Sequence, residues 1–195
     1  MALPTSGGQL GSRPPGSPDM FPGRVFPRLS TQRLLLREIT PQDRDALLAN
    51  YSDPEVARWF LEKPPASTDQ VDKILREFIS SYDRGAGLTW AIVFPESGEL
   101  LGTCGYERVE VGSEGEIGFD LAKAYWGKGL MTEALAAILA FGFGEMGLER
   151  VVASTYSRNL RACRMFEQLG FCGRPEGEDS RLFVLSRADW GARVA

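Results

Sequence analysis

Histidine is absent from this chain of 195 residues. Its absence excludes Ser-His-Asp and Cys-His catalysis and the histidine-containing zinc and iron sites, so acid-base chemistry must use carboxylates, Tyr, Lys, Cys or water. Cysteine is scarce: Cys104, Cys163 and Cys172 include no C-x-x-C pair, and their odd number argues against a disulfide framework. We therefore expect no metal site and a reducing, cytoplasmic setting.

Long apolar runs and an excess of positive charge are also missing. The stretch from Ala134 to Phe143 is about half of the ~20 residues that a membrane-spanning helix needs, so it predicts a buried helix. The net charge is -4 and the isoelectric point is about 5.1. Nucleic-acid-binding proteins usually carry a basic face. The sequence thus predicts neither a membrane nor a nucleic acid as a partner.

The composition that remains is typical of one soluble globular domain, with 43% hydrophobic and 25% charged residues. Residues 1–28 are rich in Gly, Pro and Ser and lack apolar periodicity, which predicts a flexible tail before a single domain at 29–195. Met20 lies near the end of this tail, so the sequence leaves open whether translation starts at Met1 or Met20.

Apolar periodicity, caps and turns predict a mixed α/β domain with strands and helices interspersed along the chain. Predicted helices follow Thr40-Pro41, Asp53-Pro54 and the capping box from Ser67 to Gln70, and two more cover residues 130–143 and 160–169. The predicted strands cover residues 34–37, 89–94, 100–111, 116–121, 151–155 and 181–186.

Two glycines, Gly127 and Gly129, precede the helix predicted at 130–143. Glycines there let unpaired backbone N–H groups at a helix start approach an anion, and Lys128 adds a positive charge. A plain strand-to-helix connection and a nucleotide-phosphate site are the alternatives. The spacing fits neither a Walker loop nor a dinucleotide-binding loop. The sequence predicts an anion-binding turn of another kind.

The segment from Tyr125 to Ala134 resembles the acetyl-CoA pyrophosphate loop of the GNAT superfamily, Q/R-x-x-G-x-G/A. Trp126, Gly129 and Met131 occupy the three marked places. Trp and Met depart from the general pattern, but the run Tyr-Trp-Gly-Lys-Gly resembles the RimJ/RimL-like branch. The segment from Asn159 to Phe171 resembles a second signature of the family, an N-x-x-S/A helix closed by E-K-L-G-F.

This resemblance implies a single GNAT-like α/β (α+β) domain with a mixed, mostly antiparallel sheet of about six to seven strands, splayed at the cofactor site and flanked by helices. It implies an N-acetyltransferase that moves the acetyl group of acetyl-CoA to a primary amine, directly and within a ternary complex. The amine would belong to a protein N-terminus, such as that of a ribosomal protein, or to a small molecule. The alternative is a CoA-binding domain with little or no transferase activity. Both a monomer and a homodimer stay open.

The resemblance also assigns roles to individual residues. Backbone groups of the strand at 116–121 would bind the pantetheine arm, the glycine turn would bind the pyrophosphate, and the helix at 160–169 would line the cofactor channel. The implied cofactor-binding residues are Phe119, Leu121, Trp126, Gly127, Lys128, Gly129, Leu130, Met131, Thr132, Asn159, Ala162 and Phe166.

A carboxylate is the expected general base, because histidine is absent. Glu116 resembles the glutamate that the family has on this strand, and Glu107 is the rival; the plain alternative for Glu116 is a charge on a solvated strand face. Phe166 and Ala162 stand where the family often has a tyrosine and a serine that donate protons. The general acid is therefore left open between water, Cys163 and no group at all.

Overall fold

The computed structural model describes residues 25–60, 67–110 and 112–194. The predicted tail lies outside these ranges except for its last residues, 25–28. Of these, Phe26 is buried, with its ring centroid 4.9 Å from that of Tyr82 and 5.9 Å from that of Trp90. The indole Nε1 of Trp90 also donates to the Pro27 carbonyl at 2.7 Å. The chain therefore packs on the core from Phe26 onward.

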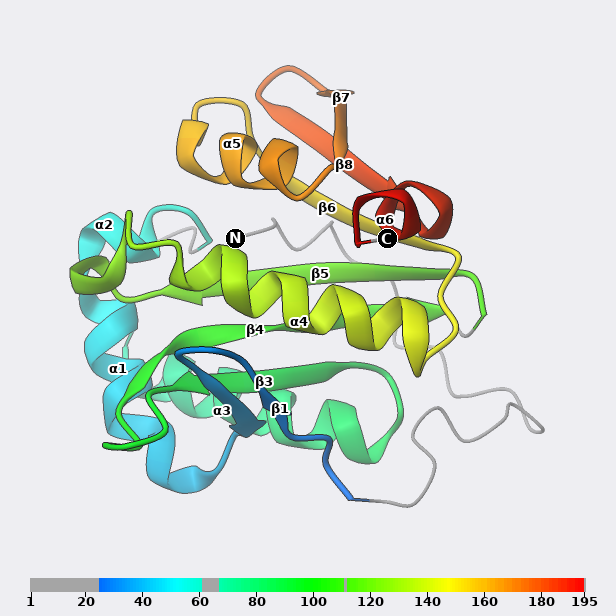
Figure 1. Ribbon diagram of the computed structural model, residues 1–195. Helices are drawn as coiled ribbons and strands as arrows, with labels where there is room; N and C mark the ends of the chain where they lie inside the picture. Colours follow the sequence, from blue (N-terminus) through cyan, green and yellow to red (C-terminus); the bar gives the residue numbers. More distant parts are fainter. Residues whose placement is uncertain (1–24, 61–66, 111, 195) are drawn as a thin grey trace.

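Eight strands form one mixed sheet in the order β1-β2-β3-β4-β5-β6-β8-β7, with only the β5 and β6 pair parallel (Figure 1). This confirms the predicted fold class, and two short strands, β1 and β7, extend the predicted set. The strands are β1 Leu29–Ser30, β2 Leu35–Glu38, β3 Leu88–Val93, β4 Leu100–Glu110, β5 Glu114–Leu121, β6 Arg150–Tyr156, β7 Cys172–Glu176 and β8 Ser180–Ser186.

The β7 strand gives no periodic signal in the sequence. It lies at the edge of the sheet, and most of its residues are exposed. Gly173 and Pro175 interrupt any alternation, and proline is tolerated in sheets mainly on such edges. Pairing with β8, which brings Gly173 opposite Phe183, is what makes this segment a strand.

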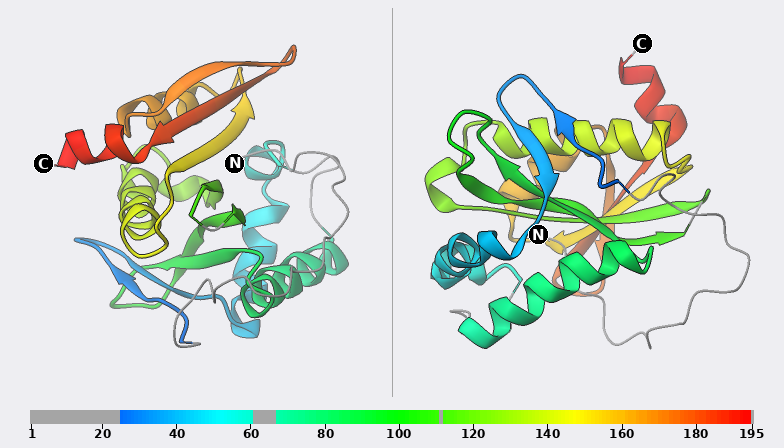
Figure 2. Two further views of the ribbon diagram at one scale, coloured as in Figure 1. Left: turned by 90° about the vertical axis from the view of Figure 1, so that its right-hand side faces the viewer. Right: turned by 90° about the horizontal axis from the view of Figure 1, so that it is seen from below.

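Helices cover both faces of the sheet (Figure 2). The α4 helix lies on one face and α3 on the other, and the α6 helix packs on α4 through stacked Trp190 and Phe143 rings. The predicted capping box is confirmed, because Ser67 and Gln70 exchange hydrogen bonds at the start of α3. The helices are α1 Arg44–Ser52, α2 Pro54–Ala57, α3 Thr68–Asp83, α4 Leu130–Gly144, α5 Leu160–Gln168 and α6 Arg187–Val194, with 3-10 turns at Pro41–Asp43 and Lys123–Tyr125.

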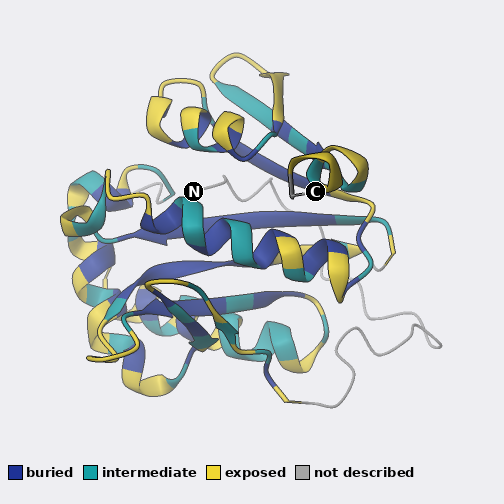
Figure 3. Cartoon of the chain, in the orientation of Figure 1, coloured by how far each residue is buried: buried dark blue, intermediate teal, exposed yellow. Residues whose placement is uncertain are grey.

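Each face of the sheet has its own apolar core, and the central strands between them are almost entirely buried (Figure 3). The larger core joins the sheet to α4 and α5 and includes Trp90, Ile138 and Phe166. The smaller one joins β3 to α1 and α3 and includes Leu47 and Leu75. None of the helices in the described ranges has both the length and the apolarity of a membrane span.

The sheet separates between β5 and β6. Only the first residues pair, Glu114 to Glu116 with Arg150 to Val152, although both strands continue for several residues. Figure 1 shows the two strands diverging toward the end where α4 begins. Residues 117–121 of β5 therefore have no neighbouring strand on that side, and this opening positions the site.

Candidate functional site

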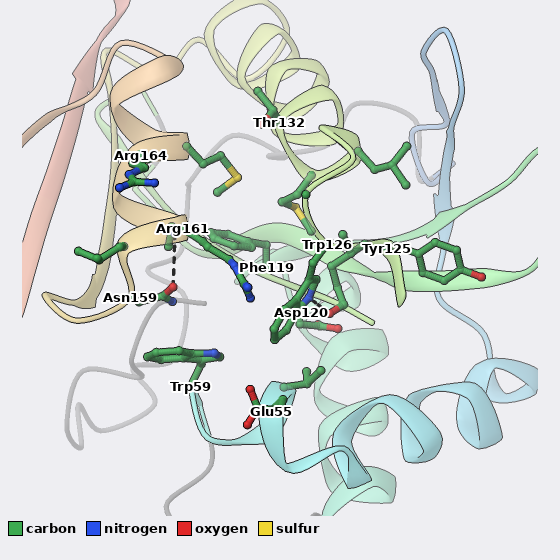
Figure 4. A pocket seen from close by; sticks show the side chains of 18 of the residues that line it. Glu55, Trp59, Phe119, Asp120, Tyr125, Trp126, Thr132, Asn159, Arg161 and Arg164 are labelled. Carbon is green, nitrogen blue, oxygen red and sulfur yellow. Dashed lines mark hydrogen bonds between the residues drawn. The ribbon is translucent and has the colours of Figure 1, made fainter. Parts of the chain in front are cut away.

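A cleft of about 690 Å³ lies where β5 and β6 have separated. Its walls come from four elements far apart in the sequence: α2, the end of β5, the glycine turn with the start of α4, and α5 (Figure 4). The predicted cofactor residues that border it are Phe119, Leu121, Trp126, Gly127, Gly129, Leu130, Met131, Thr132, Asn159 and Ala162. The fold thus gathers most of the predicted binding residues around one opening.

The two glycines of the turn both adopt a left-handed backbone, with φ of 72° at Gly127 and 73° at Gly129. Gly129 is the N-cap of α4, where the positive end of the helix dipole lies. Within the described chain, no hydrogen bond uses the backbone N–H groups of residues 127–132. A Cβ at Gly127 would have no protein atom within 4 Å. The turn is therefore an open row of donors that fits a diphosphate.

Lys128 lies differently from the rest of the turn. It does not border the cleft, and its ammonium lies 5.3 Å from the centroid of the Tyr125 ring. Four exposed arginines border the cleft: Arg158, Arg161 and Arg164 beside or on α5, and Arg58 after α2, which is ion-paired with Glu55. The positive charge bordering the cleft thus comes from these two walls rather than from the turn.

Arg33 fixes the glycine turn from outside the cleft. Its Nη1 donates to the Lys128 carbonyl at 2.9 Å, and its Nε forms an ion pair with Glu133 at 2.7 Å. Glu133 also accepts from Thr31 at 2.6 Å. Partial burial opposes the ionisation of Glu133, but the hydrogen bonds from Thr31 and Arg33 outweigh it and lower the pKa of this carboxyl. This network holds the turn open around its unpaired N–H groups.

We expect Arg33→Ala to weaken CoA binding by about fivefold, equivalent to ~1 kcal/mol, because the turn loses its hydrogen bond from Arg33 to the Lys128 carbonyl and loosens while the cleft wall is unchanged. Isothermal titration with CoA measures this. Arg84→Ala is the matched control, because Arg84 and Arg33 have equally exposed side chains, 44% each, and both form ion pairs. Equal CoA affinity of the two variants would contradict the positioning role.

Trp126, at the first marked place of the loop pattern, ties the turn to β5. Its indole Nε1 donates to the Leu121 carbonyl at 2.6 Å. The guanidinium of Arg161 lies 4.9 Å from the centroid of its ring, so the side chain also meets α5 across the cleft. Because the Leu121 carbonyl already accepts this bond, only one of its lone pairs is left for a ligand.

Asn159 is the N-cap of α5. Its Oδ1 accepts from the Ala162 N–H at 3.4 Å (Figure 4), and its Nδ2 donates to Thr155 Oγ1, also at 3.4 Å. Ala162 borders the cleft, whereas Phe166, one turn further along, is fully buried behind Phe119 with the ring centroids 5.7 Å apart. Phe166 thus supports the wall from within the core.

Glu116 is not on a solvated face. It is only 9% exposed and its Oε2 accepts from Arg108 Nε at 3.1 Å and from Arg108 Nη2.

Glu107 lies over Gly118, where an added Cβ would overlap its carboxylate. Crowding by protein atoms and the negative charge of Glu116 raise the pKa of Glu107 to about 7, although water still reaches this side chain and limits the desolvation. Neither glutamate borders the cleft.

Asp120 is the carboxylate that sequence reasoning did not select. It borders the cleft and is 5% exposed. Together with Glu116 and Glu107 it forms a line of carboxylates along one face of β5, which we name the carboxylate row. The sequence carried a signal for it, because Asp120 lies four residues after Glu116 on β5 and therefore shares its face. Among the described residues, no cluster of His, Cys, Asp and Glu is arranged to hold a metal ion.

Comparison with known proteins agrees with this architecture. A family model described as an acetyltransferase (GNAT) domain matches residues 33–172. The uncharacterised N-acetyltransferase YoaA of Bacillus subtilis is 31% identical over 148 residues, which cover 75% of this chain and 84% of that protein. The alanine N-acetyltransferase of ribosomal protein uS5 from Escherichia coli is 28% identical over 181 residues, covering 86% and 88%.

Solved structures show the same fold. A GNAT-family acetyltransferase from Bacillus anthracis superposes with a TM-score of 0.71 at 21% identity, covering 83% of this chain and 99% of that one. The ribosomal-protein acetyltransferase RimL, solved with coenzyme A, gives 0.73 at 17% identity, covering 82% and 98%. The family match, the relatives and the splayed sheet with its open glycine turn agree: this chain belongs to the GNAT acetyltransferases, on their RimJ/RimL-like branch.

Proposed function

We propose that the protein transfers the acetyl group of acetyl-CoA to a primary amine, directly and within a ternary complex. The observation that carries this proposal is the opening between β5 and β6, because it gives a cleft on which the glycine turn, α5 and the carboxyl end of β5 converge. A thioester held in this opening is reachable by a second substrate beside β5.

In this proposal the donor half of the site uses the chain's own backbone. The N–H groups at residues 127–132 bind the pyrophosphate, and Arg158, Arg161 and Arg164 lie close enough to the opening to neutralise further phosphate charge. The pantetheine arm lies along Phe119 and Leu121 like an added strand, with Asn159 and Ala162 opposite. Acetyl-CoA supplies the activated acyl group.

The chemistry needs few protein groups. The amine lone pair attacks the thioester carbonyl carbon, a carboxylate takes the amine proton, and the C–S bond breaks with its electron pair on sulfur. The sequence names Glu116 as the base and Glu107 as the rival, and both stay predictions. We assign no side chain as the general acid, since Phe166 and Ala162 carry no proton donor, so water protonates the leaving thiolate.

Charge supports the choice of acceptor. The carboxylate row gives this face of β5 a negative potential that favours a cationic amine. One relative is named for acetylating the alanine of a ribosomal protein. We therefore propose two acceptor classes, a protein N-terminus and a small cationic amine, which share the primary amine and differ in what surrounds it.

A free-thiol assay with acetyl-CoA tests the proposal over a panel of peptides with N-terminal Ala or Ser, a polyamine and free amino acids. We expect at least one amine to release CoA thiol well above the rate of hydrolysis, and ATP not to displace CoA. Tight CoA binding without turnover on any amine would overturn the transferase proposal in favour of a CoA-binding domain. Displacement of CoA by ATP would favour a nucleotide site.

A further inference from the structure

The members of the carboxylate row stand at different distances from the opening of the sheet. Glu116 is the last residue of β5 that pairs with β6, so it lies where the sheet is still closed. Asp120 is four residues further along, beside the cleft-lining Phe119 and Leu121. Figure 4 shows Asp120 below Phe119, on the side of the cleft that faces Glu55 of α2. Position alone thus sets Asp120 apart from the two glutamates.

The surroundings of Asp120 hold it in one orientation and leave room for one more donor. Oδ1 accepts from Asn50 Nδ2 at 2.6 Å, and Oδ2 accepts from Tyr51 at 2.9 Å and from the Thr103 hydroxyl. Oδ1 accepts one of these bonds and Oδ2 accepts two, so Oδ1 is the oxygen with room for a further donor; the backbone N–H of Thr103 adds a weaker contact that lowers the pKa of Asp120. By contrast, Glu116 is engaged by the guanidinium of Arg108.

We propose that Asp120 is the catalytic base of the transfer, a role that deepens the proposed function and rests on it. The amine approaches from the α2 side, where Glu55 and Trp59 form the wall, and donates to the remaining position on Asp120 Oδ1. As the C–N bond forms, the nitrogen becomes acidic and its proton moves to Asp120. The C–S bond then breaks, the CoA thiolate takes a proton from water, and Asp120 returns its proton to solvent.

The acid-base properties of the cluster fit this role. Burial raises the pKa of Asp120 to about 6, against the opposing hydrogen bonds from Thr103 and Tyr51. Burial and the nearby Asp120 charge raise the pKa of both Tyr51 on α1 and Cys104 on β4, so these two stay neutral at physiological pH.

Among the described residues, the charged groups around Asp120 include Glu107 and Glu116 in the row, the ion pair of Glu55 with Arg58 at the end of α2, and Arg161 across the cleft. Asp120 must be ionised to act as a base. The kcat/KM value is therefore expected to fall as the pH drops through about 6.

The experiment compares Asp120→Asn, Glu107→Gln and Glu116→Gln on whichever amine the wild-type protein acetylates. We expect Asp120→Asn to lower kcat by ~100-fold to ~10,000-fold, the usual contribution of a general base, with CoA affinity unchanged and the acid limb of the pH profile lost. The two glutamate variants test the rival predictions: if Asp120 is the base, each loses much less kcat than Asp120→Asn and keeps the acid limb, whereas loss of the limb in one of them assigns the base to that residue.

Tyr51→Phe separates a catalytic role from a structural one. Removing this donor leaves the carboxylate in place and raises the pKa of Asp120, so the acid limb should move to higher pH while activity above it is retained.

Full activity of Asp120→Asn with only a lower Tm would overturn the proposal. So would loss of the limb in Glu107→Gln or Glu116→Gln instead. Either result leaves the proposed function standing, because wild-type turnover establishes it separately.

Discussion

Replacing Gly127 by Val is expected to reduce CoA affinity by at least ~100-fold, because a side chain in the turn blocks two or more backbone N–H bonds to phosphate worth ~1.5–3 kcal/mol each. In the free protein the new Cβ meets no atom within 4 Å, so the loss arises at the ligand and not from a clash inside the fold. Isothermal titration with CoA measures the affinity, and circular dichroism reports the fold.

Gly98→Val is the matched control for backbone strain. Gly98 has a φ of 68°, close to the 72° of Gly127, and a Cβ there also has open space, but it lies in the turn between β3 and β4. Both variants should lose similar stability, on the order of 1–2 kcal/mol, from placing a side chain in the left-handed region. If Gly127→Val and Gly98→Val bound CoA equally well, the turn would not be the phosphate site.

Truncating Phe166 to Ala should lower the free energy of unfolding by ~3–5 kcal/mol, the usual cost of deleting a fully buried aromatic ring. The ring is 0% exposed, and its centroid lies 5.1 Å from that of Phe171 and 4.9 Å from that of Phe183. It also supports Phe119, so the cleft wall loses its backing. Urea unfolding followed by fluorescence gives the stability.

The same truncation at Phe94 provides the comparison, because this ring is only half-buried and packs mainly on Tyr125 at 5.7 Å between centroids. We expect Phe94→Ala to cost less than half as much as Phe166→Ala. An equal cost at both positions would contradict the tight enclosure of the Phe166 ring in the core. A loss at Phe166 below ~1 kcal/mol would have the same meaning.

Local chemistry explains which parts of the fold are readable from the sequence. The capping box at Ser67 and the proline after Asp53 act within one turn of helix, so the sequence alone predicts both helix starts, and both are confirmed. The left-handed glycines at 127 and 129 are local too. The β7 strand is different, because pairing with β8 creates it while its own residues show no alternation.

The candidate site likewise has one part that local segments of the sequence predict and another part that only the fold decides. The glycine turn and the Asn159 cap are contiguous segments, and their order along the chain was enough to predict the family, which the comparisons confirm, and the acyl donor, which stays a prediction. Strand alternation places Glu116 and Asp120 on one face of β5, but the groups that these carboxylates meet were not predictable. Glu116 meets Arg108 only through the register of β4 and β5, whose shift after Tyr106 brings both side chains together.

By itself, the sequence determined the family and named a set of binding residues most of which border the cleft, because each rests on a short segment whose backbone conformation its own residues set. The tertiary structure decided which carboxylates meet and which one reaches the cleft. Asn50, Tyr51 and Thr103 lie 17 to 70 positions from Asp120, and they converge on it because α1 packs on β4 and β5. Burial and charge at such a point depend on every element around it, so no local pattern encodes them.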